Sequence, residues 1–259
     1  MVWTKRAKFI LVAAFLSLGL LIIQFVSFSF RYQAIAGFTV LTYILSAWVL
    51  YEEMIGIHWI MCLILPCTYM AGVALFYFLL PEKMILRFLI ILGFSVGMYA
   101  ILLTENILSI ASTKTIQLLR AGQAVGFLMT LIAAFFIFDT IFSFKFSPWN
   151  NGLLIMIASF PLYLQSVWTI KLSKVFEKDL ITYSVILALI SGELGMAISF
   201  WPLSILIASL FLVAFFYVSM GLLQHKLSGK LFENTYKEYL QIAIVVLVIT
   251  YIMAGWGGR

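Results

Sequence analysis

Residues 203–225 read LSILIASLFLVAFFYVSMGLLQH, a run of 23 residues without Asp, Glu, Lys or Arg. The hydrocarbon core of a bilayer is about 30 Å thick, and a helix needs about 20 apolar residues to cross it. A helix also satisfies its own backbone hydrogen bonds, which lipid cannot do. The run is continuous rather than alternating, unlike the strands of a membrane β-barrel. It therefore predicts a membrane-spanning helix.

Runs of the same kind fill the rest of the 259-residue chain. Hydrophobic residues make up 64% of it and charged residues only 10%, whereas an ordinary soluble domain carries about 25% charged residues. We therefore predict an all-α fold, a polytopic transmembrane helical bundle. The short connections leave no room for a soluble domain, so residues 1–259 are expected to form a single integral membrane domain. The nine expected spans are residues 9–30, 33–51, 55–80, 84–108, 118–144, 152–170, 180–200, 203–225 and 238–255.

The division of residues 180–225 into two spans depends on the pair Trp201-Pro202. Proline removes a backbone donor and disfavours helix at the residue before it, so a tight turn is expected there. Without that turn the chain would have eight spans. An eight-span chain would put its last basic cluster out of step with the others, or would require a re-entrant segment.

The basic residues predict the orientation of the chain. With the N-terminus inside, eleven Lys and Arg residues fall in inside segments and five in outside segments. Lys and Arg are in excess on the cytoplasmic side of membrane proteins, so we expect the N-terminus inside and the C-terminus outside. The net charge of +6 then reflects topology and contacts with lipid headgroups, not nucleic-acid binding. The expected location is a bacterial or archaeal cytoplasmic membrane.

Glu193 is the foremost candidate for a functional group. It lies in the segment Ser191-Gly192-Glu193-Leu194-Gly195, near the middle of the expected span 180–200. An ionised carboxylate at that depth is costly and is usually functional or paired. Ser191, Gly192 and Gly195 would let another helix approach closely or open a cavity. Glu193 would therefore bind a proton, a cation or a ligand, or else it is a neutral side chain hydrogen-bonded to a neighbouring helix.

Two further pairs of charged residues are expected at or near the ends of the spans. Arg87 and Asp139 lie at similar depth in spans 84–108 and 118–144, and Glu105 and Arg120 flank the connection between the same spans. Consecutive spans tend to be neighbours, so both pairs favour ion pairs that fix helix packing. A gate for an ion or substrate is the alternative for Arg87 and Asp139.

A polar cluster is expected at the inner surface. It contains Glu52, Glu53 and His58, and the model of nine spans also places His225 at that surface. The simplest interpretation is a solvated acidic turn with interfacial histidines. Two imidazoles from different helices could also ligate a haem, but no other cofactor, no metal and no catalytic residue is predicted.

Three functions fit these features. The leading hypothesis is a non-enzymatic ligand-binding or transport protein with a polar intramembrane site near Glu193. The second is a structural or assembly subunit that contacts other membrane proteins as well as lipid. The third is an intramembrane enzyme that acts on a lipid-linked substrate, with Glu52, Glu53, Glu105 and His58 as its candidate groups.

Overall fold

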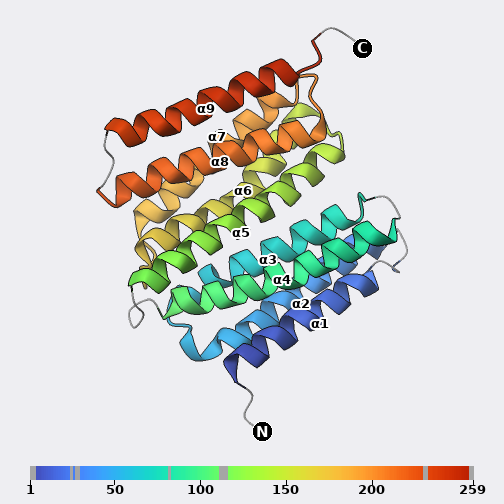
Figure 1. The fold of residues 1–259 in the computed structure, drawn as a ribbon, viewed down its shortest axis with the longest axis vertical. Coiled ribbons are helices and arrows are strands. Elements are labelled where there is room, and N and C mark those ends of the chain that lie inside the picture. Colours follow the sequence, from blue (N-terminus) through green and yellow to red (C-terminus); the bar gives the residue numbers. More distant parts are fainter. Residues whose placement is uncertain are drawn as a thin grey trace. The chain divides into compact units, whose positions relative to one another are not determined.

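The computed structural model describes residues 4–23, 26, 30–80, 83–110, 116–229 and 233–256. Within these ranges the chain forms nine α-helices and a short 3-10 helix, with no strand (Figure 1). The helices are α1 (Lys5–Ile23), α2 (Arg31–Leu50), η2 (Tyr51–Glu53), α3 (His58–Tyr77), α4 (Met84–Ser109), α5 (Ile116–Ser143), α6 (Pro148–Lys171), α7 (Lys178–Ile198), α8 (Ile205–Leu227) and α9 (Glu233–Met253).

Every α-helix of the described residues overlaps one predicted span, and each is long and apolar enough to cross a membrane. The prediction of a nine-span membrane helical fold is therefore confirmed. Two helices rather than one occupy residues 180–225, because α7 ends at Ile198 and α8 begins at Ile205. The side of the membrane on which each terminus lies stays a prediction.

Local chemistry explains where two of the helices begin. Helix α6 starts at Pro148, four residues earlier than expected, because proline suits the first position of a helix, where its missing N–H is not needed. Helix α8 starts directly after Ser204, whose hydroxyl oxygen accepts a hydrogen bond from the Ile207 amide at 3.4 Å. Such an N-cap satisfies one of the free amides at a helix start.

The chain divides into two compact units. The first contains residues 1–136 and 172–175, and the second contains residues 137–171 and 176–259. In the first unit, α3 and α4 are joined through Tyr69, whose hydroxyl donates to the Gly93 carbonyl at 3.2 Å. Its ring also stacks on Phe94 at 5.5 Å between centroids. The prediction of one continuous domain stays a prediction.

In the second unit, α6 and α7 pack with their backbones in contact. A Cβ atom on Gly152 would lie 2.9 Å from the Gly192 carbonyl oxygen, and one on Gly192 would lie 2.8 Å from that of Gly152. Small residues allow this approach between membrane helices. At Gly195 the side chain of Ile155 of α6 occupies the space that a Cβ atom would take. These glycines therefore fix the rotation of α7 about its axis.

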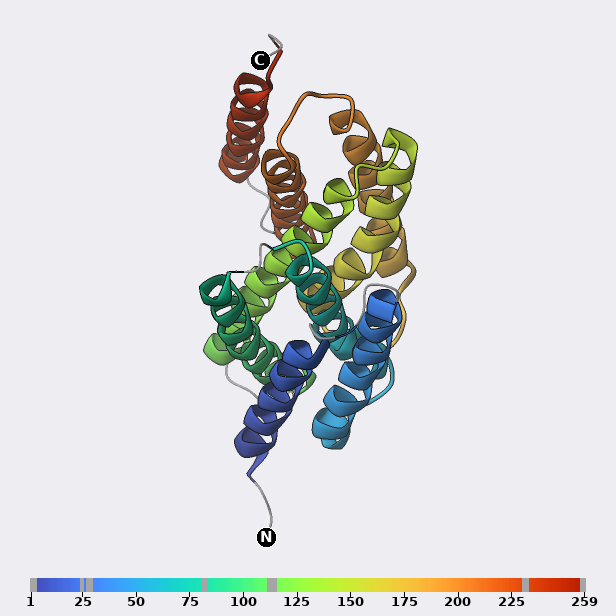
Figure 2. The same cartoon turned by 90° about the vertical axis from the view of Figure 1, so that its right-hand side faces the viewer.

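Helix α9 lies at the margin of the second unit, along α8 (Figure 2). Only 6% of the most apolar stretch of α9 is buried. Its contact with α8 includes Gly221, where the ring of Tyr239 occupies the space that a side chain would take. Most of the α9 surface therefore faces away from the unit.

Candidate ligand-binding site

The rotation of α7 turns Glu193 outward. Successive residues of a helix point about 100° apart, so a side chain next to Gly192 cannot share the face that packs on α6. Glu193 is exposed, while Ser191, Gly192 and Gly195 are buried. The four predicted site residues therefore divide between two faces. Three lie in the α6–α7 contact, and the carboxyl group stands on the outer face.

The outer face around Glu193 is apolar. Ile186, Leu189 and Ile190 are exposed on the preceding two turns, and they are side chains that suit contact with lipid. Glu193 lies five residues before the end of α7, about 7.5 Å along the axis at 1.5 Å per residue. The carboxyl group is therefore closer to one end of the span than the expected central position.

Buried and partly buried hydroxyl groups join α6, α7 and α8 behind this face. The Tyr163 hydroxyl lies 2.9 Å from the Ser191 hydroxyl oxygen and 3.3 Å from that of Ser219. The Tyr163 ring stacks on Phe216 at 4.2 Å between centroids. Buried hydroxyl groups are stable only when they are hydrogen-bonded, so this network holds the three helices in register. Sequence reasoning missed it, although a tyrosine and serines within apolar spans were the available signal.

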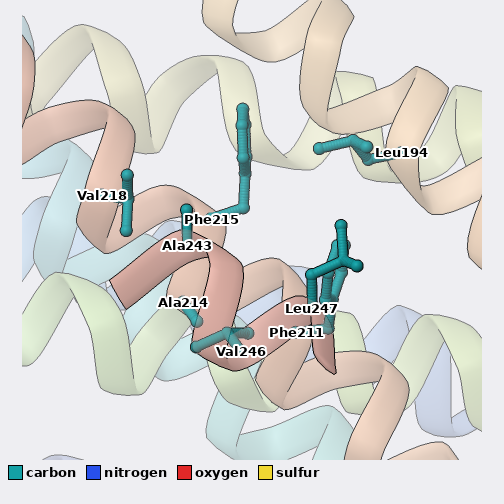
Figure 3. A pocket seen from close by; sticks show the side chains of 8 residues that line it. All are labelled: Leu194, Phe211, Ala214, Phe215, Val218, Ala243, Val246 and Leu247. Atoms are coloured by element: carbon teal, nitrogen blue, oxygen red, sulfur yellow. The ribbon is translucent and has the colours of Figure 1, made fainter. Parts of the chain in front are cut away.

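An apolar cleft of about 230 Å³ opens between α7, α8 and α9 (Figure 3). Leu194 of α7 forms one wall, and the Phe211 and Phe215 side chains of α8 lie opposite it (Figure 3). Every lining residue is apolar: Leu194, Phe211, Ala214, Phe215, Val218, Ala243, Val246 and Leu247. Sequence reasoning missed the cleft, because such residues look the same in the sequence whether they pack together or line a space.

Aromatic and polar side chains gather further along the α8–α9 contact. The His225 ring lies 5.9 Å from the Tyr239 ring, and the Tyr217 ring lies at the same centroid distance from Tyr239. His225 belongs to the second unit, while His58 is a buried residue of the first. A haem bound by His58 and His225 stays a prediction.

The predicted inner-surface cluster contains an ion-paired acid. The Glu52 carboxylate lies 3.0 Å from the Lys5 ammonium and 3.9 Å from that of Lys8. The hydrogen bond from Lys5, together with the charges of Lys5 and Lys8, lowers the pKa of Glu52. Lys8 also lies over the Trp48 ring at 5.7 Å. The side chain of Glu53 lies outside the described part of the structure.

The predicted charge pairs involve residues in different surroundings. Asp139 is buried in the second unit, where its Oδ1 accepts a hydrogen bond from the Ser209 hydroxyl at 3.2 Å, and Arg87 belongs to the first unit. Within the first unit, Glu105 is completely buried and Arg120 is exposed. The Arg87–Asp139 and Glu105–Arg120 pairs stay predictions.

A comparison with known protein families matches most of the chain. The profile of proteins described as "Protein of unknown function (DUF5656)" matches residues 28–253, which is well over half of the chain. The chain belongs to the DUF5656 family. The comparisons with curated proteins and with solved structures give no match.

The DUF5656 match covers the whole of the cleft. It includes α2 to α9, and therefore Glu193, Tyr163 and all of the residues that line the apolar space. It leaves out α1 and with it Lys5 and Lys8, which pair with Glu52. The apolar cleft thus lies entirely within the DUF5656 region.

Proposed function

We propose that this DUF5656 membrane protein binds a long-chain amphiphile, with the apolar chain in the α7–α8–α9 cleft. The observation that carries the proposal is the lining of the cleft, which consists of eight apolar side chains. A polar group placed there without a hydrogen-bond partner would cost about 2–7 kcal/mol. Apolar cavities stay dry and accept apolar molecules.

The size of the cleft limits the ligand. Sites for drug-sized molecules are commonly about 300–1,000 Å³, and this space is about 230 Å³. A single hydrocarbon chain therefore fits better than the two chains of a phospholipid. The cleft lies between helices that are apolar enough to span a membrane, so such a chain can enter from the surrounding lipid.

Glu193 supplies the polar end of the proposed site. It directly precedes Leu194, which forms a wall of the cleft, and its side chain points about 100° away from that of Leu194, on the outer face beside that wall. A carboxyl group accepts hydrogen bonds from a hydroxyl or an ammonium group. A long-chain alcohol or amine would place its tail against Leu194 and its head near Glu193. In this arrangement the exposed carboxyl group of Glu193 binds the polar head of the ligand, which explains its presence on an apolar face.

Photolabelling tests the proposal. The purified protein in phosphatidylcholine nanodiscs is exposed to a hexadecanol that carries a diazirine in its chain, and the labelled peptides are mapped by mass spectrometry. We expect labelling to concentrate on α8 and α9 around Phe211 and Leu247. Ala214→Trp fills the cleft and should reduce this labelling several-fold.

Ala36→Trp is the matched control, because Ala36 is exposed on α2 and does not line the cleft. It should leave the labelling of α8 and α9 unchanged. Uniform labelling of all lipid-facing helices, with no response to Ala214→Trp, would refute the proposal.

A further inference from the structure

A second, more polar pocket lies in the same unit, where α5 and α7 end and α6 and α8 begin. Its volume is about 250 Å³. The residues that matter here are Phe142, Lys145, Asn151, Ser199, Trp201 and Ile205. We call this space the terminal pocket. None of its lining residues is shared with the apolar cleft.

Asn151 brings a buried polar group to the terminal pocket. It is only 4% exposed. Its Nδ2 donates to the Ser199 hydroxyl oxygen at 3.1 Å and to the Phe146 carbonyl at 3.4 Å. The Ser199 hydroxyl hydrogen is already donated to the Gly195 carbonyl at 2.8 Å. Both neighbours of the amide are therefore acceptors, which fixes the nitrogen on their side and leaves Oδ1 as the remaining acceptor.

No donor from the described residues reaches that oxygen. Asn151 Oδ1 is buried and has no hydrogen-bond partner within the part of the chain that the structure describes. Buried polar atoms in proteins nearly always have a partner, and an exception calls for an explanation. Because Asn151 is one of the residues that line the terminal pocket, we attribute the missing partner to a ligand that brings a donor.

Lys145 gives the terminal pocket a positive charge. It follows the end of α5 with φ at 51°, a left-handed conformation that glycine usually supplies at a helix end. A side chain at this position is strained unless something compensates. Lys145 is exposed and is one of the residues that line the pocket, and its long side chain can bring the ammonium group to a ligand there.

The starts of two helices add to this positive potential. Helix α6 begins at Pro148 and α8 at Ile205, each more than 20 residues long. The first amides of a helix have no partner within the helix, and its dipole favours an anion there. Ile205 lines the terminal pocket and Asn151 stands in the first turn of α6. The pocket therefore suits an anion at Lys145.

We propose that the terminal pocket binds a phosphate ester that carries a hydroxyl group, of the glycerol phosphate class. The phosphate lies at Lys145 and the helix starts, and the hydroxyl donates to Asn151 Oδ1. A hydroxyl is favoured over an ammonium group, because Lys145 already brings a positive charge to the pocket and none of the lining residues is acidic, so a second cation would be repelled. The acid of α5, Asp139, lies one turn deeper and accepts from Ser209. The inference does not rest on the apolar cleft.

Calorimetry on the full chain in dodecyl maltoside tests this assignment with sn-glycerol 3-phosphate. We expect saturable binding, and binding of ethyl phosphate, which has no hydroxyl, about threefold to tenfold weaker. Lys145→Gly relaxes the backbone and removes the charge, so it should fold normally and lower affinity about tenfold or more. Lys145→Arg should retain most of the affinity. Lys178→Ala, at the opposite end of α7, is the matched control and should change nothing.

A second arm distinguishes a lipid headgroup from a free phosphate ester. The titration is repeated in phosphatidylcholine nanodiscs with and without phosphatidylglycerol, which carries the same phosphate and glycerol groups. Loss of glycerol 3-phosphate binding in the presence of phosphatidylglycerol identifies the headgroup as the occupant, and unchanged binding identifies the soluble ester. Absence of binding by the wild-type chain, or affinity unaffected by Lys145→Gly, overturns the proposal. Equal affinity for ethyl phosphate overturns the role of Asn151.

Discussion

Glu193 is a carboxyl group on a face of α7 whose neighbouring exposed side chains are apolar. Acidic residues in membrane helices usually face the interior of the bundle or a water-filled cavity. The glycines of α7 occupy the interior face instead, and the carboxyl group is left on the outer one. A carboxyl group in this position lowers the free energy of unfolding. We therefore expect it to serve the function of the protein rather than its folding.

We expect Glu193→Leu to stabilise the protein in a bilayer by about 1–3 kcal/mol, because a lipid-facing acid is replaced by an apolar side chain. Reversible unfolding in nanodiscs measures the change. Ala197→Leu, on the same face, is the control and should stay within about 0.5 kcal/mol. A loss of stability in Glu193→Leu would mean that the carboxyl group has a partner, such as a second copy of the chain.

Glu52 is the acid whose surroundings favour the charged form. The Lys5 hydrogen bond and the charges of Lys5 and Lys8 lower its pKa. A lowered pKa in the folded state contributes stability above the ordinary Glu pKa of about 4.3. That contribution is lost as the pH falls through the folded-state pKa. The link between α1 and η2 should therefore persist at neutral pH and weaken only in acid.

A carbon-13 NMR titration of Glu side chains in micelles measures this pKa, with Glu52→Gln to assign the signal. We expect Glu52 to titrate below the ordinary Glu value, and Lys5→Ala to raise its pKa. An unchanged pKa in Lys5→Ala would contradict the ion pair. Lys178→Ala, far along the sequence from this cluster, controls for the loss of one positive charge.

At the scale of the helices, the α6–α7 contact depends on glycine. A Cβ atom at position 192 would lie 2.8 Å from the backbone oxygen of Gly152, and a backbone atom cannot move aside as a flexible side chain can. We expect Gly192→Ala to lower the free energy of unfolding by about 1–3 kcal/mol. Titration with sodium dodecyl sulfate, followed by circular dichroism, provides the measurement.

Gly37 is the matched control for this contact. It also lies within a helix, but a Cβ atom there would meet nothing within 4 Å. Gly37→Ala should therefore be neutral or stabilising by up to about 1 kcal/mol, through helix propensity alone. Equal effects of Gly37→Ala and Gly192→Ala would show that helix propensity, and not the backbone contact, decides the stability.

At the scale of the whole molecule, length and polarity along the chain were predictable, and rotation about each helix axis was not. The apolar runs and the Trp201-Pro202 pair predicted nine spans, since crossing a bilayer is mainly a matter of length. The Arg87–Asp139 pair stays a prediction, whereas the hydrogen bond from Ser209 to Asp139 in the second unit was not predicted. Spans that are apolar all round carry no signal for which face turns inward. The cleft, the outward face of Glu193 and the Asn151 network therefore required the structure.

An odd number of spans places the two chain ends on opposite sides of the membrane, and the excess of basic residues predicts the N-terminus inside. We expect a Cys introduced at Thr4 to be labelled by a membrane-impermeant thiol reagent only after cells are permeabilised. A Cys at Trp256 should be labelled in intact cells. Cys62 and Cys67 are replaced by Ala in both variants to remove the background from the native thiols.

The same orientation decides which solution reaches the terminal pocket. With the N-terminus inside, α5 and α7 end outside, so Lys145 faces the exterior and a phosphate ester must come from there or from the outer leaflet. A Cys at Ser147, an exposed residue two positions after Lys145, should then be labelled in intact cells like the one at Trp256. Labelling of positions 4 and 256 from the same side would exclude nine crossings. If position 147, like position 4, is labelled only after permeabilisation, the terminal pocket opens on the cytoplasmic side of the membrane.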